Sequence, residues 1–151
     1  MGIFSTLNIS ASALSAERQR SEVAATNLAN VDTTHRTDGT GPFRRKEVVL
    51  TSMGGSRFRG LLPASTGGTD ARNQPGGVRL TRVVEDSTPP VRRYEPGNPD
   101  ADKEGYVAYP AINPVQEMVD LMGSVRAYQL NASAIAASKQ LIQQSIDLLK
   151  S

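Results

Sequence analysis

The stretch that decides the fold runs from residue 113 to residue 149 and reads NPVQEMVDLMGSVRAYQLNASAIAASKQLIQQSIDLL. Counting from Met118 in alternate steps of three and four residues gives ten positions, and nine of them carry apolar residues. This spacing persists for more than four heptads and is typical of a coiled-coil seam. The ten positions are Met118, Leu121, Val125, Tyr128, Ala132, Ile135, Lys139, Ile142, Ile146 and Leu149.

The start of this helix is also encoded in the sequence. Asn113 is a favourable N-cap, Pro114 suits the first helical position, and Gln116 stands where the partner of a capping box belongs. A helix over 114–149 would be about 54 Å long, given the usual rise per residue. Because this is longer than a small domain is wide, the helix must protrude or pack along an equally long partner.

The N-terminal residues repeat the same spacing, and six of their eight seam positions are apolar. Asn30 suits the left-handed position that stops a helix. We therefore expect helical arms over 1–30 and 113–151, paired as an antiparallel, coiled-coil-like unit. The eight positions are Phe4, Leu7, Ala11, Leu14, Arg18, Ser21, Ala25 and Leu28.

The central segment, 31–112, differs from both arms in composition. It contains eleven of the thirteen Gly and eight of the nine Pro, residues that break helices and mark turns. Strands are expected over 44–51, 78–85 and 91–94, and a long loop over 52–77, which has seven Gly and two Pro. The sequence thus predicts an α+β fold in which two long terminal helices flank a small, irregular β-rich domain.

The composition excludes most catalytic and metal-dependent classes. The chain has 151 residues with no Cys, which removes disulfides, thiolate metal sites and Cys nucleophiles. A single histidine, His35, leaves no His cluster for zinc and makes a histidine-based catalytic triad improbable. None of the sequence motifs of serine hydrolases, P-loop nucleotide-binding proteins or zinc proteases is present. We expect no enzyme activity and no cofactor.

Two further motifs give only weak indications of ligand binding. Residues 100–105 begin like a calcium-binding loop, but the position of the essential twelfth-residue Glu is occupied by Ala111. Basic pairs at 44–46 and 92–93 could contact phosphates, yet the central segment has a charge of only +2 and no aromatic residues interleave with these runs. We therefore interpret residues 100–105 as a solvated turn and the basic residues at 44–46 and 92–93 as part of a protein interface.

No segment has the composition of a transmembrane helix. The charge-free stretch 127–138 has 12 residues and is half polar, whereas a membrane span needs roughly 20 apolar residues. The first 14 residues contain neither a basic region nor an unbroken apolar run, so no cleavable signal peptide is expected. If the protein leaves the cytoplasm, another export route must carry it.

Two interpretations of the paired arms remain open. In one, the helices form a closed hairpin over the β domain; in the other, they also bury their remaining faces against other copies. Each arm has zero net charge, which slightly favours assembly. The expected assembly interface comprises Phe4, Leu7, Ala11, Leu14, Ala25, Leu28, Asn30, Met118, Leu121, Val125, Tyr128, Ala132, Ile135, Ile142, Ile146 and Leu149.

Three segments resemble the bacterial flagellar axial proteins, the family of rod, hook and hook-associated subunits. Residues 27–33, NLANVDT, are similar to the N-terminal signature of that family. Residues 113–131 resemble its C-terminal motif, and the stretch 94–110 together with the short length narrows the resemblance to proximal rod proteins. The likeness covers both arms and about half of the centre.

The resemblance implies a structural subunit of the flagellar basal body that the flagellar type III apparatus exports and that assembles in the periplasm. It implies contacts with other copies and with the rod subunits FlgB, FlgF and FlgG, and possibly with FliE. Direct membrane insertion and nucleic-acid binding are not expected. The alternative is a basic adaptor domain that binds nucleic acid or an acidic protein; its binding would weaken steeply with salt.

Overall fold

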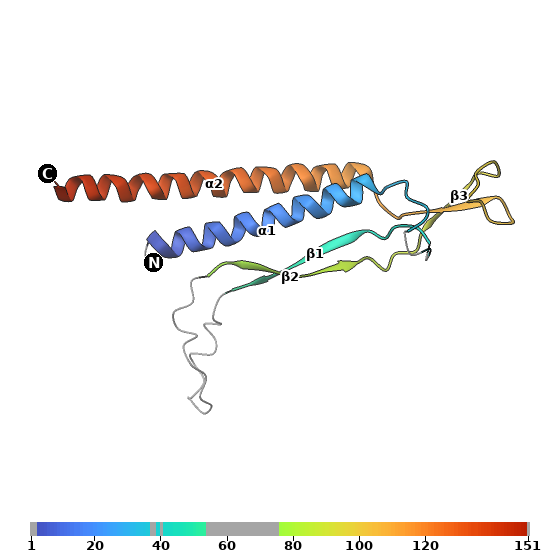
Figure 1. Cartoon of the computed structure of the whole chain (residues 1–151), viewed down its shortest axis with the longest axis horizontal. Helices are drawn as coiled ribbons and strands as arrows, with labels where there is room; N and C mark the ends of the chain where they lie inside the picture. The colour runs from blue at the N-terminus through green and yellow to red at the C-terminus, as the bar shows by residue number, and fades with distance from the viewer. Residues whose placement is uncertain (1–2, 37–38, 40, 54–75, 151) are drawn as a thin grey trace, which may run out of the picture.

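The computed structural model describes residues 3–36, 39, 41–53 and 76–150. Two long helices, α1 (Ile3–Ala29) and α2 (Pro114–Lys150), lie side by side and run in opposite directions (Figure 1). Two antiparallel β hairpins lie between them in the sequence. The predicted α+β fold with paired terminal helices and a small β region between them is confirmed.

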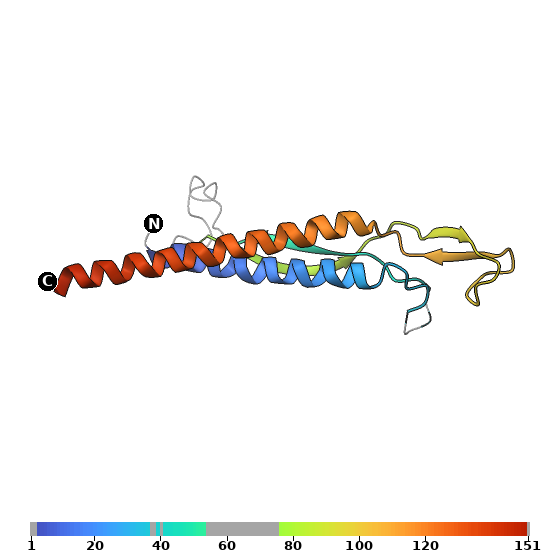
Figure 2. The ribbon, with the colours of Figure 1, turned by 90° about the horizontal axis from the view of Figure 1, so that it is seen from above.

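Helix α1 forms the middle layer of the subunit. It packs against α2 on one side and against the first hairpin, β1 (Lys46–Ser52) and β2 (Val78–Glu85), on the other (Figure 1). The second hairpin, β3 (Val91–Tyr94) and β4 (Tyr106–Tyr109), extends beyond the end of the helix pair (Figure 2). The molecule is therefore a long, layered rod with helices over most of its length and a hairpin at one end.

Local hydrogen bonds explain where α1 ends. The side-chain amide of Asn30 donates to the carbonyl of Thr26 at 2.8 Å, and its backbone N–H donates to the carbonyl of Asn27 at 3.2 Å. The Thr33 hydroxyl then donates to Oδ1 of Asn30 at 3.1 Å. These bonds satisfy carbonyls that a helix end leaves without partners. The Asn-x-x-Thr part of the sequence signature is thus a helix stop followed by a fixed exit turn.

Helix α2 begins as the sequence predicts. Oδ1 of Asn113 accepts the backbone N–H of Val115 at 3.0 Å and that of Gln116 at 3.5 Å. The Asn113 carbonyl also accepts the N–H of Glu117 at 3.1 Å. Asn113 is therefore the N-cap, and Pro114 occupies the first helical position, where a missing N–H costs nothing.

Three of the four strands lie where they were expected, and one was missed. β2 and β3 have the predicted bounds, and β1 begins two residues later than predicted. β4, whose four residues directly follow the 100–105 turn, was not predicted. Most of the long loop expected over 52–77 lies outside the described residues.

The apolar core of the subunit is very small. Ala16, Ala24 and Val107 are the buried hydrophobic residues among those that the structure describes. The largest fully buried side chains also include Glu117 and Asn27, which are polar. The buried positions of the two helices are therefore held by small and polar residues, and their large apolar side chains are half-buried, as at Leu121 and Ile135, or exposed.

The turn of the second hairpin provides a test of the fold. Gly105 has a φ of 83°, and an added Cβ would lie 2.9 Å from Cε2 of Tyr94. Gly105→Ala should therefore destabilise the hairpin by at least ~1–2 kcal/mol, the usual cost of a left-handed residue with a side chain. Gly97→Ala is the matched control, because nothing lies within 4 Å of its Cβ position. Near-ultraviolet circular dichroism during urea unfolding would detect the difference; equal effects of the two substitutions would contradict this account.

Candidate assembly surface

The predicted seam of α2 coincides only in part with the surface that faces α1. Glu117 and Ser124 are the buried residues of the helix, one position before the seam residues Met118 and Val125. Met118 is 49% exposed and Leu149 is 88% exposed. Of the remaining predicted α2 residues, Val125, Tyr128 and Ile146 are exposed, and Leu121, Ala132, Ile135 and Ile142 are half-buried.

The predicted residues of α1 divide in the same way. Phe4 is 77% exposed at the start of the helix, and Ala11 and Ala25 are also exposed. The others are half-buried, partly covered by α2 and the first hairpin: Leu7, Leu14, Leu28 and Asn30. The predicted interface is therefore spread along both helices as a set of partly and fully exposed side chains.

Sequence reasoning missed further exposed apolar residues on α2. Val115, Val119 and Met122 are exposed, and with Met118 and Val125 they form one group, the outer patch. Members of the outer patch are three or four residues apart, so they share one face of the helix. The other missed residues on α2 are Leu130, Leu141 and Leu148. A second series of alternate four- and three-residue steps, begun at Val115, would have found the three missed members of the outer patch.

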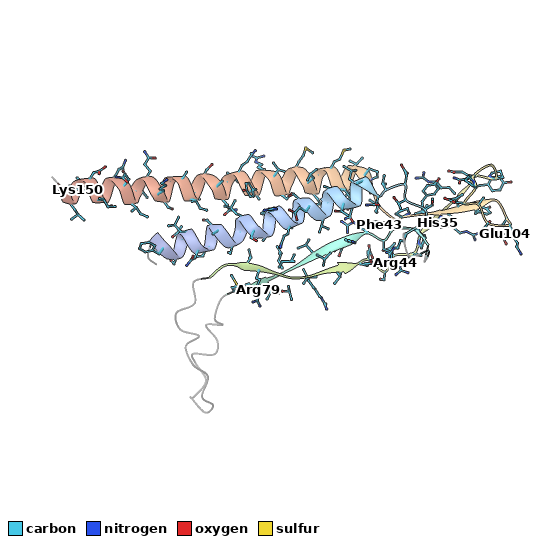
Figure 3. The ribbon with its side chains drawn as sticks, in the orientation of Figure 1. His35, Phe43, Arg44, Arg79, Glu104 and Lys150 are labelled. Atoms are coloured by element: carbon cyan, nitrogen blue, oxygen red, sulfur yellow. The ribbon has the colours of Figure 1, made fainter. Side chains whose placement is uncertain are left out.

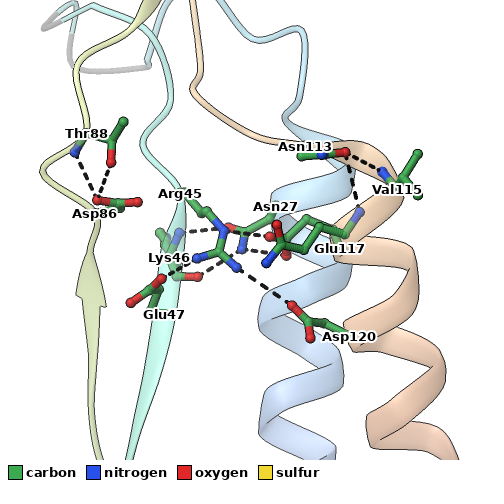
Figure 4. Close-up of polar contacts among 11 residues, drawn as sticks. Asn27, Arg45, Lys46, Glu47, Asp86, Thr88, Asn113, Val115, Glu117 and Asp120 are labelled. Carbon is green, nitrogen blue, oxygen red and sulfur yellow. Dashed lines mark hydrogen bonds and ion pairs between the residues drawn. The ribbon is translucent and has the colours of Figure 1, made fainter.

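A buried polar cluster joins three elements near the start of α2 (Figure 4). Asn27 of α1 donates through Nδ2 to the Lys46 carbonyl at 2.9 Å, and its Oδ1 accepts the Lys46 N–H at 2.8 Å. The same Nδ2 donates to Oε2 of Glu117 at 3.0 Å. Nε of Arg45 donates to the other carboxylate oxygen, Oε1, at 2.6 Å. We call Asn27, Arg45 and Glu117 the polar cluster.

Arg45 links the polar cluster to further acidic residues of β1 and α2. It also pairs with Glu47 on β1, and its Nη2 lies 3.8 Å from Oδ2 of Asp120 on α2. Partial burial alone would lower the pKa of Arg45, but the hydrogen bond and charge of Glu117, with a contribution from Glu47, raise it above the ordinary value. The guanidinium therefore stays charged and compensates the buried Glu117 carboxylate.

A polar cleft lies beside the polar cluster, between α1, α2 and β1. Its charged lining is balanced: it comprises the bases Arg20, Arg45 and Lys46 and the acids Glu47, Glu117 and Asp120. Because these charges balance, the lining has no preference for a ligand of one charge. Within the described residues, no group of three or more His, Asp or Glu side chains is arranged to hold a metal ion.

The acidic run at the hairpin turn is engaged in local contacts. Oδ1 of Asp102 accepts the backbone N–H groups of Glu104 and Tyr106, each at 2.9 Å. Its other oxygen pairs with Arg92. Asp100 accepts the Thr34 hydroxyl at 2.5 Å and thereby ties the turn to the segment that follows α1. The turn is built around these carboxylates.

The basic residues of β3 stack on tyrosines of the same hairpin. The Arg92 guanidinium lies 4.9 Å from the ring centroid of Tyr106, and that of Arg93 lies 4.7 Å from the centroid of Tyr109. Figure 3 shows this hairpin, marked by Glu104, at the end of the molecule opposite Lys150. The arginine pair that could have contacted phosphates therefore has intramolecular partners.

Comparison with known proteins identifies the family. Residues 7–35 match the family described as flagella basal body rod protein, and residues 103–148 match the C-terminal region of the flagellar basal body rod FlgEFG proteins. The flagellar basal-body rod protein FlgC of Bacillus subtilis is 40% identical over 99% of this chain and 100% of its own length. The FlgC proteins of Escherichia coli and Borreliella burgdorferi are 36% and 33% identical, over 98% and 99% of both chains.

The chain belongs to the flagellar basal body rod family. The two matched segments contain most of α1 and α2, whereas the likeness to the FlgC relatives extends over nearly the whole chain. Asn27 and Glu117 of the polar cluster fall within them, whereas Arg45 lies in the central segment that neither match covers. Among the described residues, this rod-family chain has no helix that is both long and apolar enough to cross a membrane.

Acid should loosen the second hairpin. Hydrogen bonds from the Tyr106 and Glu104 backbone, with the Arg92 contact, lower the pKa of Asp102; bonds from Asn98 and Tyr109 lower that of Glu95. Because both folded-state pKa values are depressed, their stabilisation is present above the ordinary carboxyl pKa of about 4 and is lost as the pH falls through the lowered values.

Near-ultraviolet circular dichroism can follow this transition, because three of the four tyrosines lie in the hairpin. The signal should hold from pH 7 to about pH 4.5 and decline below it. Asp102→Asn and Glu95→Gln should each shift the acid transition. An unchanged transition in both variants would show that these carboxylates do not control it.

Proposed function

We propose that this chain is a structural subunit of the flagellar basal-body rod that assembles through the exposed apolar faces of its terminal helices and transmits torque. The observation that carries this proposal is the distribution of apolar surface. Three small or medium-sized hydrophobic residues are buried among those described, while the outer patch and most other large apolar residues of α2 face solvent. Contiguous exposed apolar surface of this kind marks an interaction site.

The geometry of the helix pair supports assembly along its length. α2 has 37 residues and exposes apolar side chains from its first turn to its last. A neighbouring helix packed against α2 would bury the outer patch. Each Å² of apolar surface buried in this way would stabilise the assembly by about 25 cal/mol. Closely packed helices have low compressibility, so a bundle of such pairs would be stiff enough to carry torque.

The proposed partners are other copies of this chain and the adjoining rod subunits FlgB, FlgF and FlgG, with FliE as a possible neighbour. Family membership supports assembly with rod components. We further propose export by the flagellar type III apparatus without a cleavable signal peptide, and assembly in the periplasm. Membership of the basal body rod family supports that route.

We propose no catalytic role. Arg45 and Glu117, the titratable groups of the polar cluster, are bonded to each other, and they are also bonded to Glu47 and Asn27, respectively. A general acid or base needs a group free to exchange a proton with a substrate. Family membership in a set of structural rod proteins agrees with this interpretation.

The outer patch can be tested at Met122, which is 64% exposed in the subunit. Met122→Asp should leave the subunit folded, because the side chain has little contact within it, but should prevent assembly. Burying an unpaired carboxylate costs several kcal/mol, and each copy in a repeating structure would incur that cost. Met122→Leu is the matched control, since it keeps volume and apolar character.

The measurement is the swimming of cells that carry each variant as their only copy, together with the amount of variant exported. We expect Met122→Asp to be exported but to give non-motile cells without complete basal bodies, and Met122→Leu to swim. Normal swimming of the Met122→Asp strain would contradict the outer patch as an assembly surface.

A further inference from the structure

We propose that the polar cluster of Asn27, Arg45 and Glu117 fixes the register between the two terminal helices and, through Arg45, the position of β1 against both. The inference concerns the subunit itself, and only its consequence for assembly rests on the proposed function. Its basis is a contrast between the cluster and the rest of the helix–helix contact (Figure 4).

Among the described residues, the rest of the contact has no comparable feature that defines a register. Its buried residues Ser10, Ala24 and Ser124 are small. Its half-buried residues combine small side chains with apolar ones that recur at heptad steps on α2, at Leu121, Ile135 and Ile142. Side chains that recur at heptad steps pack in much the same way after one helix slides by a heptad. Uniform packing of that kind permits several registers of similar free energy.

The polar groups further along α2 do not remove this ambiguity. The Ser124 hydroxyl donates to the Leu121 carbonyl, and the Ser138 hydroxyl donates to the Ala134 carbonyl, each within α2 itself. The Asn131 amide likewise donates to the carbonyl of Ala127. These bonds persist in any register, because they do not involve α1.

The polar cluster, in contrast, can form in only one register. Glu117 is 1% exposed, and its two oxygens are bonded separately, one by Asn27 of α1 and one by Arg45 next to β1. Asn27 has both of its amide protons and its carbonyl oxygen engaged, with Glu117 and with the Lys46 peptide. A heptad shift of α2 would separate Glu117 from both donors and leave a buried carboxylate without compensation.

Buried polar groups that specify register do so without adding much stability, because their desolvation offsets their attraction. Replacing the whole cluster by apolar residues should therefore preserve the pairing of α1 with α2 but allow more than one register. A cluster that served stability alone would behave in the opposite way. This difference makes the two roles separable by experiment.

The chain has no cysteine, so introduced cysteine pairs can report the register directly. Ala13 and Asn131 lie two heptads along from Asn27 and Glu117, so Ala13→Cys with Asn131→Cys reports the native register. Ala13→Cys combined with Ser124→Cys or with Ser138→Cys reports a shift of one heptad in either direction. Disulfide formation is measured on the full-length subunit in solution as a mobility shift on a non-reducing gel.

With the native cluster, the Ala13–Asn131 pair should form a disulfide at least about tenfold more than either shifted pair. In an Asn27→Leu, Arg45→Met, Glu117→Leu background, that preference should fall to within about threefold, while helix content and melting temperature remain at or above those of the parent. Ser10→Ala, which removes a buried hydroxyl elsewhere on α1, is the control and should leave the preference unchanged.

Two outcomes would overturn the inference: a triple variant that still prefers the native pair about tenfold, or one that loses helix pairing altogether. The first would mean that other contacts set the register, and the second that the cluster is a source of stability. Because crosslinking does not require assembly, its result is independent of the Met122→Asp swimming test. Either proposal can therefore fail while the other stands.

Discussion

The buried carboxylate of Glu117 imposes the condition on which the rest of the subunit depends. A charge withdrawn from water must be met by donors at fixed positions, and here those donors come from α1 and from the residue that leads into β1. The helix pair and the first hairpin consequently cannot be placed independently. Asn27 strengthens this link, since its side chain pairs with the Lys46 peptide as a neighbouring strand would.

The same arrangement explains why so little apolar surface is buried. The buried positions of the helix pair are occupied by small and polar groups, and most of the large apolar residues of α2 are exposed. Taken alone, such a subunit forgoes much of the hydrophobic free energy available to a chain of this length. Surrounded by similar helices, it would recover that free energy, which suits a protein of the rod family.

The sequence predicted the helices well because their signals are local. Asn113 at the N-cap, Asn30 at the helix stop and sustained three–four spacing each act within a few residues. The side of α2 that faces α1 could not be predicted, because apolar spacing favours Met118 and Val125 while long-range bonds from Asn27 and Arg45 turn Glu117 inward. β4 was missed although its partner β3 has the same length and was expected, because its pairing with β3 is not visible in the local sequence.

The unequal lengths of the helices have a consequence for growth. α2 has 37 residues and α1 has 27, and since the polar cluster aligns them near the start of α2, the surplus lies at the C-terminal end of α2 (Figure 1). One tip of the subunit is thus a single helix about 15 Å long, and the other is a tyrosine-rich hairpin. A head-to-tail stack of such units would be a polar filament whose two termini present different chemistry to an incoming subunit. Addition would then proceed at unequal rates at the two termini, and elongation would acquire a direction from the shape of the monomer.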